Sequence, residues 1–155
     1  MTRSPSAYCY LYEPDPRNIG KLRHNLRRFD GVFTLHESAV SDCEGVRPFS
    51  SEPTGRFGGL DAGPSMRAKA RTITVQVEHV NTVLERVLSS TEIIDLLKID
   101  TEGSEVATVR AIEPRLLARI RHIVIESRDH RMQIDGFRTE ARCDAVRFTS
   151  EKLSG

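Results

Sequence analysis

Three carboxylates follow an apolar segment in the second half of the chain. Residues 93–99 form an almost continuous apolar run, and Asp100, Glu102 and Glu105 come directly after it, with Gly103 among them. Apolar runs of this kind are typical of parallel strands that helices cover on both faces. In an open α/β sheet, ligands bind outside the carboxyl ends of the strands. The sequence therefore indicates a catalytic or binding site at the end of this segment.

The aspartate at position 100 allows more than one role. The Asp100 carboxylate can orient or deprotonate a substrate hydroxyl, or it can bind a divalent cation such as Mg²⁺ or Ca²⁺ with other oxygen ligands. The structural alternative is that Asp100 caps the following helix. Because side chains alternate along a strand, Lys98 lies on the same face as Asp100. We expect Lys98 to pair with Asp100 or with a neighbouring carboxylate.

Glu102 and Glu105 fall in the first turn of the predicted helix, where the helix dipole favours a carboxylate by about 0.3–1 kcal/mol. This structural explanation suffices for Glu105 more readily than for Glu102. A second buried strand ends in Glu126, which can join Asp100 in a polar cluster or simply be solvated. His130 follows that strand and is a further candidate base, although a surface position is the more common interpretation of such a histidine.

The elements that position these residues alternate between strands and helices. We predict strands over residues 7–12, 32–36, 46–49, 72–77, 93–99 and 122–126, helices over residues 17–29, 80–88 and from 103, and a hairpin over residues 136–148. Asn81 is the predicted N-cap of the second helix. Residues 50–71 hold four glycines and two prolines, which predicts a long loop. We interpret residues 1–155 as one domain with a mainly parallel α/β sheet.

Composition narrows the classes of function. Lys and Arg number 23 against 22 Asp and Glu, so the net charge of +1 gives no electrostatic reason to expect nucleic-acid binding. No apolar run approaches the roughly 20 residues that span a bilayer, and the first residues lack the apolar core of a secretory signal. Cys9, Cys43 and Cys143 have no metal-ligand spacing. We interpret them as reduced thiols of a cytoplasmic protein.

Three segments in order resemble the FkbM family of methyltransferases. They are Glu13-Pro-Asp-Pro16, Ala39-Val-Ser-Asp42 and Leu97-Lys-Ile-Asp-Thr-Glu-Gly-Ser-Glu105. The last is similar to the family signature Lys-Ile-Asp-x-Glu-Gly-x-Glu. The similarity continues through Ile123-Val-Ile-Glu126 and Gly136-Phe137, so it spans nearly the whole chain.

The resemblance implies a Rossmann-like class I methyltransferase sheet, mostly parallel with a C-terminal antiparallel hairpin. It also implies that S-adenosylmethionine donates a methyl group to a hydroxyl oxygen of a small molecule, sugar or lipid. Glu13 would accept hydrogen bonds from the ribose of the cofactor, and Ser41 and Asp42 would lie beside the adenine. The structural alternatives are an exposed carboxylate for Glu13 and an Asx turn for Asp42. Asp100 would serve both cofactor and substrate, and Glu102 and His130 are the other candidate catalytic residues.

The chain departs from the family pattern at its start. Family members begin with a strand, a glycine-rich turn and a helix that cradle the methionine part of the cofactor, whereas this chain opens at what resembles their second strand. In the family's sheet the first strand lies between the second and fourth, so we expect a gap between residues 7–12 and 93–99. One alternative function is a non-catalytic remnant or fragment that acts as a binding module. A nicotinamide-dependent Rossmann enzyme is a third hypothesis, against which the central signature argues.

Overall fold

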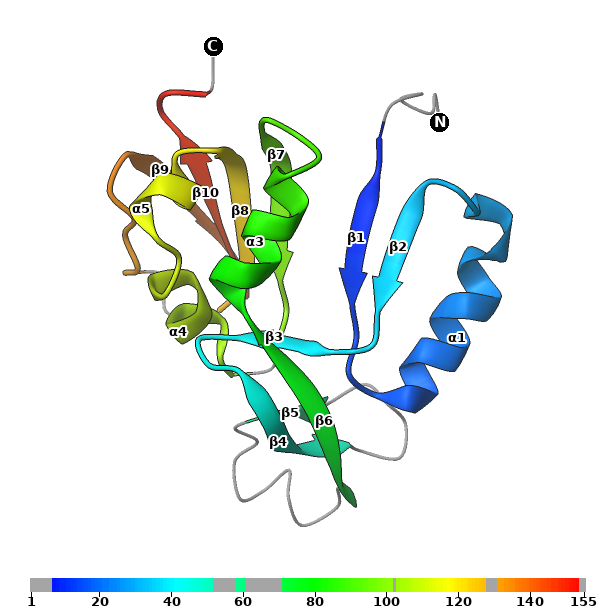
Figure 1. Cartoon of the computed structure of the whole chain (residues 1–155). Helices are drawn as coiled ribbons and strands as arrows, with labels where there is room; N and C mark the ends of the chain where they lie inside the picture. Colours follow the sequence, from blue (N-terminus) through cyan, green and yellow to red (C-terminus); the bar gives the residue numbers. More distant parts are fainter. Residues whose placement is uncertain (1–6, 52–57, 61–70, 102, 128–130, 154–155) are drawn as a thin grey trace.

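The computed structural model describes residues 7–51, 58–60, 71–101, 103–127 and 131–153. Helices and strands alternate along much of this part of the chain, and its strands form three sheets (Figure 1). The predicted α/β class is therefore confirmed.

The first sheet is a parallel pair whose strands are connected by a helix. It comprises β1 (Cys9–Tyr12), α1 (Pro16–Leu26), the 3₁₀ turn η1 (Arg27–Phe29) and β2 (Phe33–His36). The Asp15 carboxylate accepts a hydrogen bond from the N–H of Arg17, and Pro16 supplies a φ angle suited to the first helical position. Gly31 adopts a φ of 80°, a conformation that glycine tolerates well, and so allows the chain to turn into β2.

The second sheet has the order β3-β6-β4-β5. Its strands are β3 (Ala39–Ser41), β4 (Gly45–Ser51), β5 (Gly58–Gly59) and β6 (Arg71–His79). Residues 46–49 and 72–77 were predicted as strands, and they pair in the structure, with Val46 opposite Gln76 in an antiparallel register. A long loop was predicted over residues 50–71. Those residues of this range that the structure describes lie in β4, β5 or β6 or directly beside β5, and the rest lie outside the described residues.

The third sheet has the order β7-β8-β10-β9 and carries the main core. Its elements are α3 (Val80–Leu88), β7 (Ile94–Ile99), α4 (Glu105–Arg110), α5 (Pro114–Leu117), β8 (Ile120–Glu126), β9 (Phe137–Arg142) and β10 (Ala145–Ser150). The predicted C-terminal hairpin is present as β9 and β10. The N-cap of α3 is His79, not Asn81 as predicted, because His79 Nδ1 accepts a hydrogen bond from the N–H of Asn81 at 3.2 Å.

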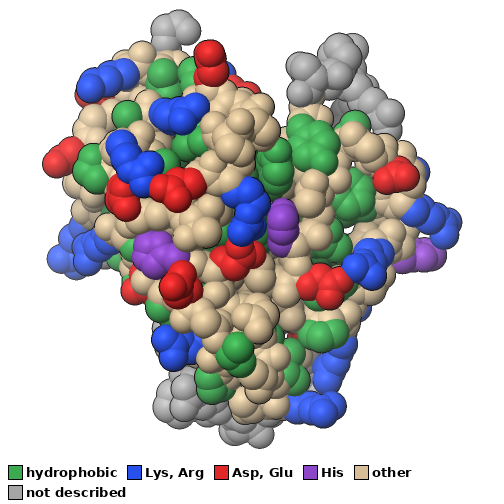
Figure 2. Space-filling view, viewed as in Figure 1, with side chains coloured by type: hydrophobic (Ala, Val, Ile, Leu, Met, Phe, Trp, Pro, Cys, Tyr) green, Lys and Arg blue, Asp and Glu red, His purple; other side chains and the backbone are tan. Residues whose placement is uncertain are grey.

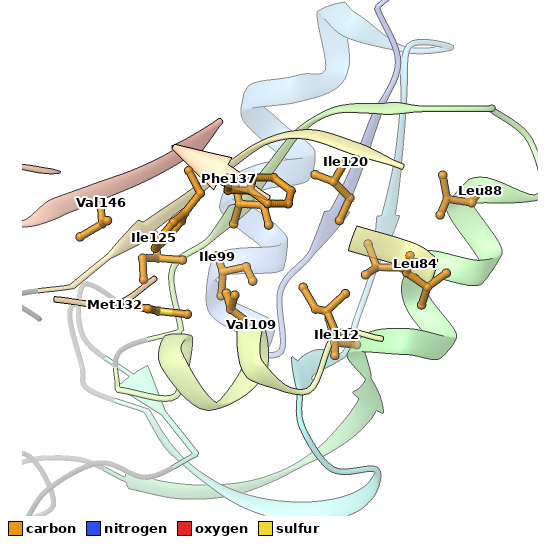
Figure 3. Close-up of a cluster of buried hydrophobic side chains, with 14 residues drawn as sticks. Leu84, Leu88, Ile99, Val109, Ile112, Ile120, Ile125, Met132, Phe137 and Val146 are labelled. Carbon is orange, nitrogen blue, oxygen red and sulfur yellow. The ribbon is translucent and has the colours of Figure 1, made fainter. Parts of the chain in front are cut away.

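Side chains of α3, α4 and α5 pack together with the third sheet to form the core (Figure 3). Ile120, Ile123, Ile125, Val146 and Phe148 are fully buried. Burial of each such side chain contributes about 1.5–3 kcal/mol relative to exposure. The prediction of a strand covered on both faces is wrong for β7, since Leu96 is 58% exposed while Ile99 is buried.

The strands of the described residues are not mainly parallel, because the second and third sheets are mixed. Parallel pairs join β1 to β2, β3 to β6 and β7 to β8, whereas β4–β6, β4–β5, β8–β10 and β9–β10 are antiparallel. The short connection between β9 and β10 does not allow the crossover that parallel pairing of consecutive strands needs. Within the described residues no strand lies between β1 and β7, and Figure 2 shows a hollow dividing the upper part of the molecule there.

The helices of the described residues are too short or too polar for a membrane span.

Candidate functional site

Asp100 directly follows β7, and Glu126 is the last residue of β8, the parallel neighbour of β7. Ile99 of β7 lies opposite Ile125 of β8, so the next residue of each strand carries its carboxylate to the same edge of the sheet. The negative charge of Asp100 raises the pKa of Glu126, and a hydrogen bond between the two side chains and burial act in the same direction. The proton on Glu126 is therefore held more tightly than on an isolated carboxylate.

Lys98 completes this cluster, as predicted. Its Nζ lies 2.7 Å from Oδ2 of Asp100, and its charge partly offsets the rise in the pKa of Glu126. Both side chains are solvent-exposed, so the pair contributes little to stability. Its main effect is to orient the Asp100 carboxylate. Asp100 does not cap α4, because the N-cap position is Ser104.

Glu105 shapes the loop between β7 and α4. Its carboxylate is buried and accepts hydrogen bonds from the N–H of Thr101 at 2.9 Å and from the N–H of Gly103 at 3.0 and 3.1 Å. Gly103 adopts a φ of 124°, a conformation open to glycine and strained for other residues. This role was not predicted from the sequence, where a glutamate two residues after a glycine was the available signal. The loop after Asp100 is thus held by one carboxylate.

Glu13 directly follows β1 and is half-buried. Burial raises the pKa of its carboxyl, while hydrogen bonds from the N–H of Asp15, at 2.8 Å, and from Asn18 oppose that rise. Asp15 is itself buried and accepts a hydrogen bond from the Ser51 hydroxyl, a link that the sequence analysis missed. Hydrogen bonds to Glu13 and Asp15 therefore fix the conformation of the Glu13-Pro-Asp-Pro16 segment. The Glu13 carboxylate still has lone pairs that can accept hydrogen bonds from a ligand.

Ser41 and Asp42 lie at the end of β3. The Ser41 hydroxyl is buried and donates to Oδ1 of Asp42 at 2.9 Å. Ser41 pairs with His79, the N-cap of α3, so these residues lie near the start of that helix.

A polar network joins the first two sheets to α3. Arg86 donates to the Tyr12 hydroxyl at 3.2 Å and to Glu78, which also accepts from the Ser38 hydroxyl at 2.6 Å. The Tyr12 ring stacks on the imidazole of His36, with centroids 4.6 Å apart. Nε2 of His36 is buried and has no hydrogen-bond partner among the described atoms. This network was not predicted, because its members lie far apart in the sequence.

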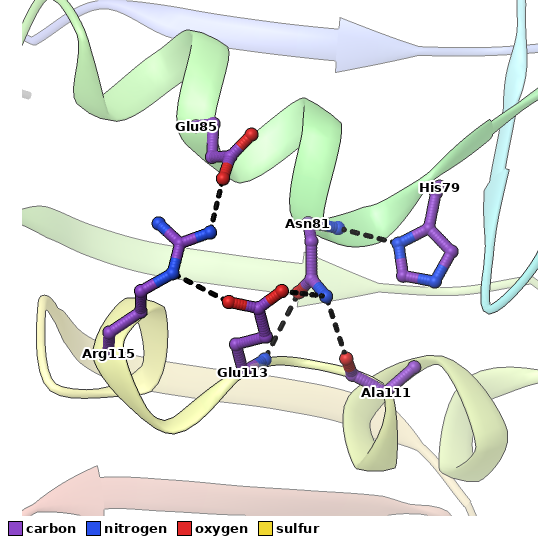
Figure 4. A network of polar contacts seen from close by, with 6 residues as sticks. All are labelled: His79, Asn81, Glu85, Ala111, Glu113 and Arg115. Atoms are coloured by element: carbon purple, nitrogen blue, oxygen red, sulfur yellow. Dashed lines mark hydrogen bonds and ion pairs between the residues drawn. The ribbon is translucent and has the colours of Figure 1, made fainter.

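A second network fastens α3 to α4 and α5 (Figure 4). Asn81 donates to the carbonyl of Ala111 at 3.1 Å and accepts from the N–H of Glu113 at 3.1 Å. Arg115 forms ion pairs with Glu113 and Glu85. These contacts fix the helices that support β7 and β8, so we interpret them as structural.

Two candidate catalytic residues, Glu102 and His130, lie outside the described residues. Over the positions that the structure describes, no group of three His, Cys, Asp or Glu side chains is arranged to hold a metal ion.

An α/β chain with carboxylates at the ends of neighbouring parallel strands has the layout of many α/β enzymes. The family model of the methyltransferase FkbM domain matches residues 2–146, and the chain therefore belongs to the FkbM methyltransferase family. Methyl transfer is the activity that this membership indicates. No curated protein and no solved structure matches the chain.

Proposed function

We propose that the protein transfers a methyl group from S-adenosylmethionine to a hydroxyl oxygen of a small molecule, sugar or lipid. The observation that carries the proposal is the pairing of Asp100 with Glu126 at adjacent strand ends, in a chain of this family. A hydroxyl group is a weak nucleophile until its proton is removed, and a carboxylate held in place by Lys98 is suited to accept that proton.

S-adenosylmethionine, when bound, supplies a methyl group activated by its sulfonium charge. The contribution of this chain is to hold the acceptor hydroxyl in line with that methyl group, which is the main source of rate enhancement in such a reaction. Asp100 accepts the proton of the acceptor hydroxyl as the new oxygen–carbon bond forms. Glu126 shares the site, and the charge of Asp100 raises the pKa of its carboxyl.

Glu13, Ser41 and Asp42 are the proposed cofactor residues, together with Asp100. Donors on a ribose and on an adenine amine need acceptors, and the carboxylates of Glu13 and Asp42 fit that requirement. Glu13 already accepts hydrogen bonds from the N–H of Asp15 and from Asn18, and Asp42 accepts one from Ser41. These internal bonds hold the carboxylates in place without using all their lone pairs, which supports the assignment.

Calorimetric titration of S-adenosylmethionine into the folded chain tests the cofactor proposal. We expect saturable binding, weakened about tenfold in Glu13→Gln, a loss of roughly 1.4 kcal/mol. Lys152→Gln, an exposed residue in the turn after β10, is the control that leaves the affinity unchanged. A folded chain that does not bind the cofactor would contradict the proposal.

Methyl transfer to a panel of hydroxylated acceptors tests the role of Asp100. Removing a general base commonly lowers kcat by about 10²–10⁴-fold, and we expect a loss in this range for Asp100→Asn. Turnover of Asp100→Asn equal to that of Lys152→Gln would remove Asp100 from the mechanism.

A further inference from the structure

Positive charge is concentrated in α1 and in the 3₁₀ turn η1 that follows it. Residues 16–29 contain five Lys and Arg side chains and no Asp or Glu, although the net charge of the whole chain is only +1. The remainder of the chain is therefore net negative. We call the basic side chains of this segment the α1 basic face, and its members are Arg17, Lys21, Arg23, His24, Arg27 and Arg28.

The members of the α1 basic face are all exposed and lie on one side of the helix. An α-helix has about 3.6 residues per turn, so residues three or four positions apart lie on the same side. A basic residue recurs at this spacing from Arg17 to Arg28. The buried Ile19 and the half-buried Leu26 lie on the opposite side. The helix therefore presents a continuous basic surface to solvent.

The stability of α1 does not explain this arrangement. Acidic residues in the first turn and opposite charges at i, i+4 stabilise a helix. The first turn of α1 has no acidic residue, and Arg23 and Arg27 place like charges at i, i+4. Glu37, just after β2, forms an ion pair with Arg23, but both side chains are more than half exposed, so the pair offsets little of the repulsion. A negatively charged partner would offset it more fully.

Exposed apolar side chains adjoin one end of the α1 basic face. The guanidinium of Arg28 lies over the ring of Phe29, 5.1 Å from its centroid, and the carbonyl of Phe29 accepts a hydrogen bond from the N–H of Val32 at 3.2 Å. Val32 is 44% exposed, and Tyr8, just before the neighbouring strand β1, is 50% exposed. Basic side chains beside exposed apolar ones are typical of surfaces that bind the interface of an anionic bilayer. Contact with phosphates alone would not need the apolar side chains.

We propose that the α1 basic face, together with Val32, binds the surface of a membrane that contains anionic lipids. The basic side chains attract the lipid headgroups, and Val32 enters the boundary between headgroups and acyl chains. Figure 1 shows α1 at the outer edge of the molecule, separated from the third sheet by β1 and β2. Figure 2 shows basic side chains and a histidine over α1 at the right margin of the view. The proposal does not depend on methyl transfer, because it rests on the charge and exposure of α1.

Flotation of the whole chain with lipid vesicles tests the proposal. Vesicles of phosphatidylcholine with about 30% phosphatidylserine are compared with vesicles of phosphatidylcholine alone. We expect binding to the anionic vesicles to be at least about tenfold stronger. Most of this binding should be lost at about 1 M salt, where charges are screened beyond about 3 Å.

Arg27→Gln/Arg28→Gln is the variant that tests the α1 basic face. Loss of each basic side chain near an anionic surface weakens binding about fivefold, so the double substitution should weaken it about 25-fold. Arg47→Gln/Lys152→Gln removes the same charge from exposed positions of β4 and of the turn after β10, and should leave binding unchanged. The two double variants have the same net charge, so a difference between them reports on the location of the charges.

Val32→Ser tests the apolar contact without changing any charge. It should weaken binding to the anionic vesicles about fivefold, whereas Val46→Ser, at an exposed position of β4, should leave binding unchanged. Absence of binding to anionic vesicles, equal binding to both kinds of vesicle, or equal weakening by the two double variants would overturn the proposal. Equal binding of Val32→Ser and Val46→Ser would also overturn it, as would binding of duplex DNA in preference to the vesicles, because nucleic acid would then be the partner.

Discussion

Asp100 and Glu126 share one electrostatic environment, and the charge of Asp100 is the largest reason that the pKa of Glu126 is raised. Lys98 acts in the opposite direction and Asp144 adds to the rise, so the charges around Glu126 decide how tightly its proton is held. This relationship can be measured without knowing the acceptor.

We expect Asp100→Asn to lower the pKa of Glu126 toward its ordinary value of about 4.3, because the substitution removes the nearby negative charge. A carboxyl-detected NMR titration measures the change. Asp135→Asn, an exposed position away from the pair, is the control and should leave Glu126 unaffected. An identical Glu126 titration in the Asp100→Asn protein would show that the two side chains do not interact.

Glu78 makes stability depend on pH in the opposite way to Glu126. The hydrogen bond from Arg86 lowers the pKa of Glu78, burial opposes this, and the bond from Ser38 lowers it further. Its stabilising contribution is present above the unfolded-state value of about 4.3 and is lost as the pH falls through the lower folded-state pKa.

Glu78→Gln should therefore cost about 0.5–1 kcal/mol at pH 7, the range of a partly exposed charged contact, and less at pH 3. Urea denaturation at both pH values measures the difference. An equal loss at the two pH values would mean that packing, not charge, accounts for the effect.

Glu105→Gln should destabilise the protein by about 1–3 kcal/mol, because the buried carboxylate accepts through both charged oxygens, whereas glutamine offers one neutral acceptor oxygen and turns an N–H₂ donor toward the backbone N–H groups. The fall in thermal midpoint measures it. Glu140→Gln on the exposed strand β9 is the control, with an expected change within about 0.5 kcal/mol. Equal midpoints for the two variants would refute the view that Glu105 holds the loop.

Ile123→Ala should cost about 2–5 kcal/mol, because it leaves a cavity in the main core. The exposed Leu96→Ala should change stability by no more than about 0.5 kcal/mol. Chemical denaturation with matched slopes compares the two. A small cost at Ile123 would mean that the third sheet is loosely packed.

Local patterns predicted most of the elements. Apolar spacing predicted a helix over residues 17–29, where the structure has α1 and η1, and the two-residue alternation of residues 72–77 lies within β6. Charged residues on one strand face also predicted the contact between Lys98 and Asp100. Such features depend on neighbours within a few positions, which the sequence displays directly.

Features made by distant residues were not predictable in this way. The hydrogen bond between Arg86 and Tyr12 joins residues that are 74 positions apart, so no local sequence pattern predicts it. The mixed character of the sheets was missed for the same reason, because β8 pairs in antiparallel with β10 and not with β9, which follows it in the chain. Glu105 was read as a favourable charge at a helix start, although its main partners are the N–H groups of the preceding loop.

All three tyrosines of the chain, Tyr8, Tyr10 and Tyr12, lie in or next to β1, and the chain has no tryptophan. Its near-ultraviolet absorbance and intrinsic fluorescence therefore originate almost wholly from one strand. Burial raises the pKa of Tyr12, so in an alkaline spectrophotometric titration this ring should ionise above the ordinary tyrosine range. The tyrosines at β1 therefore act as an intrinsic spectroscopic probe, and structural changes at that strand can be followed without an added dye.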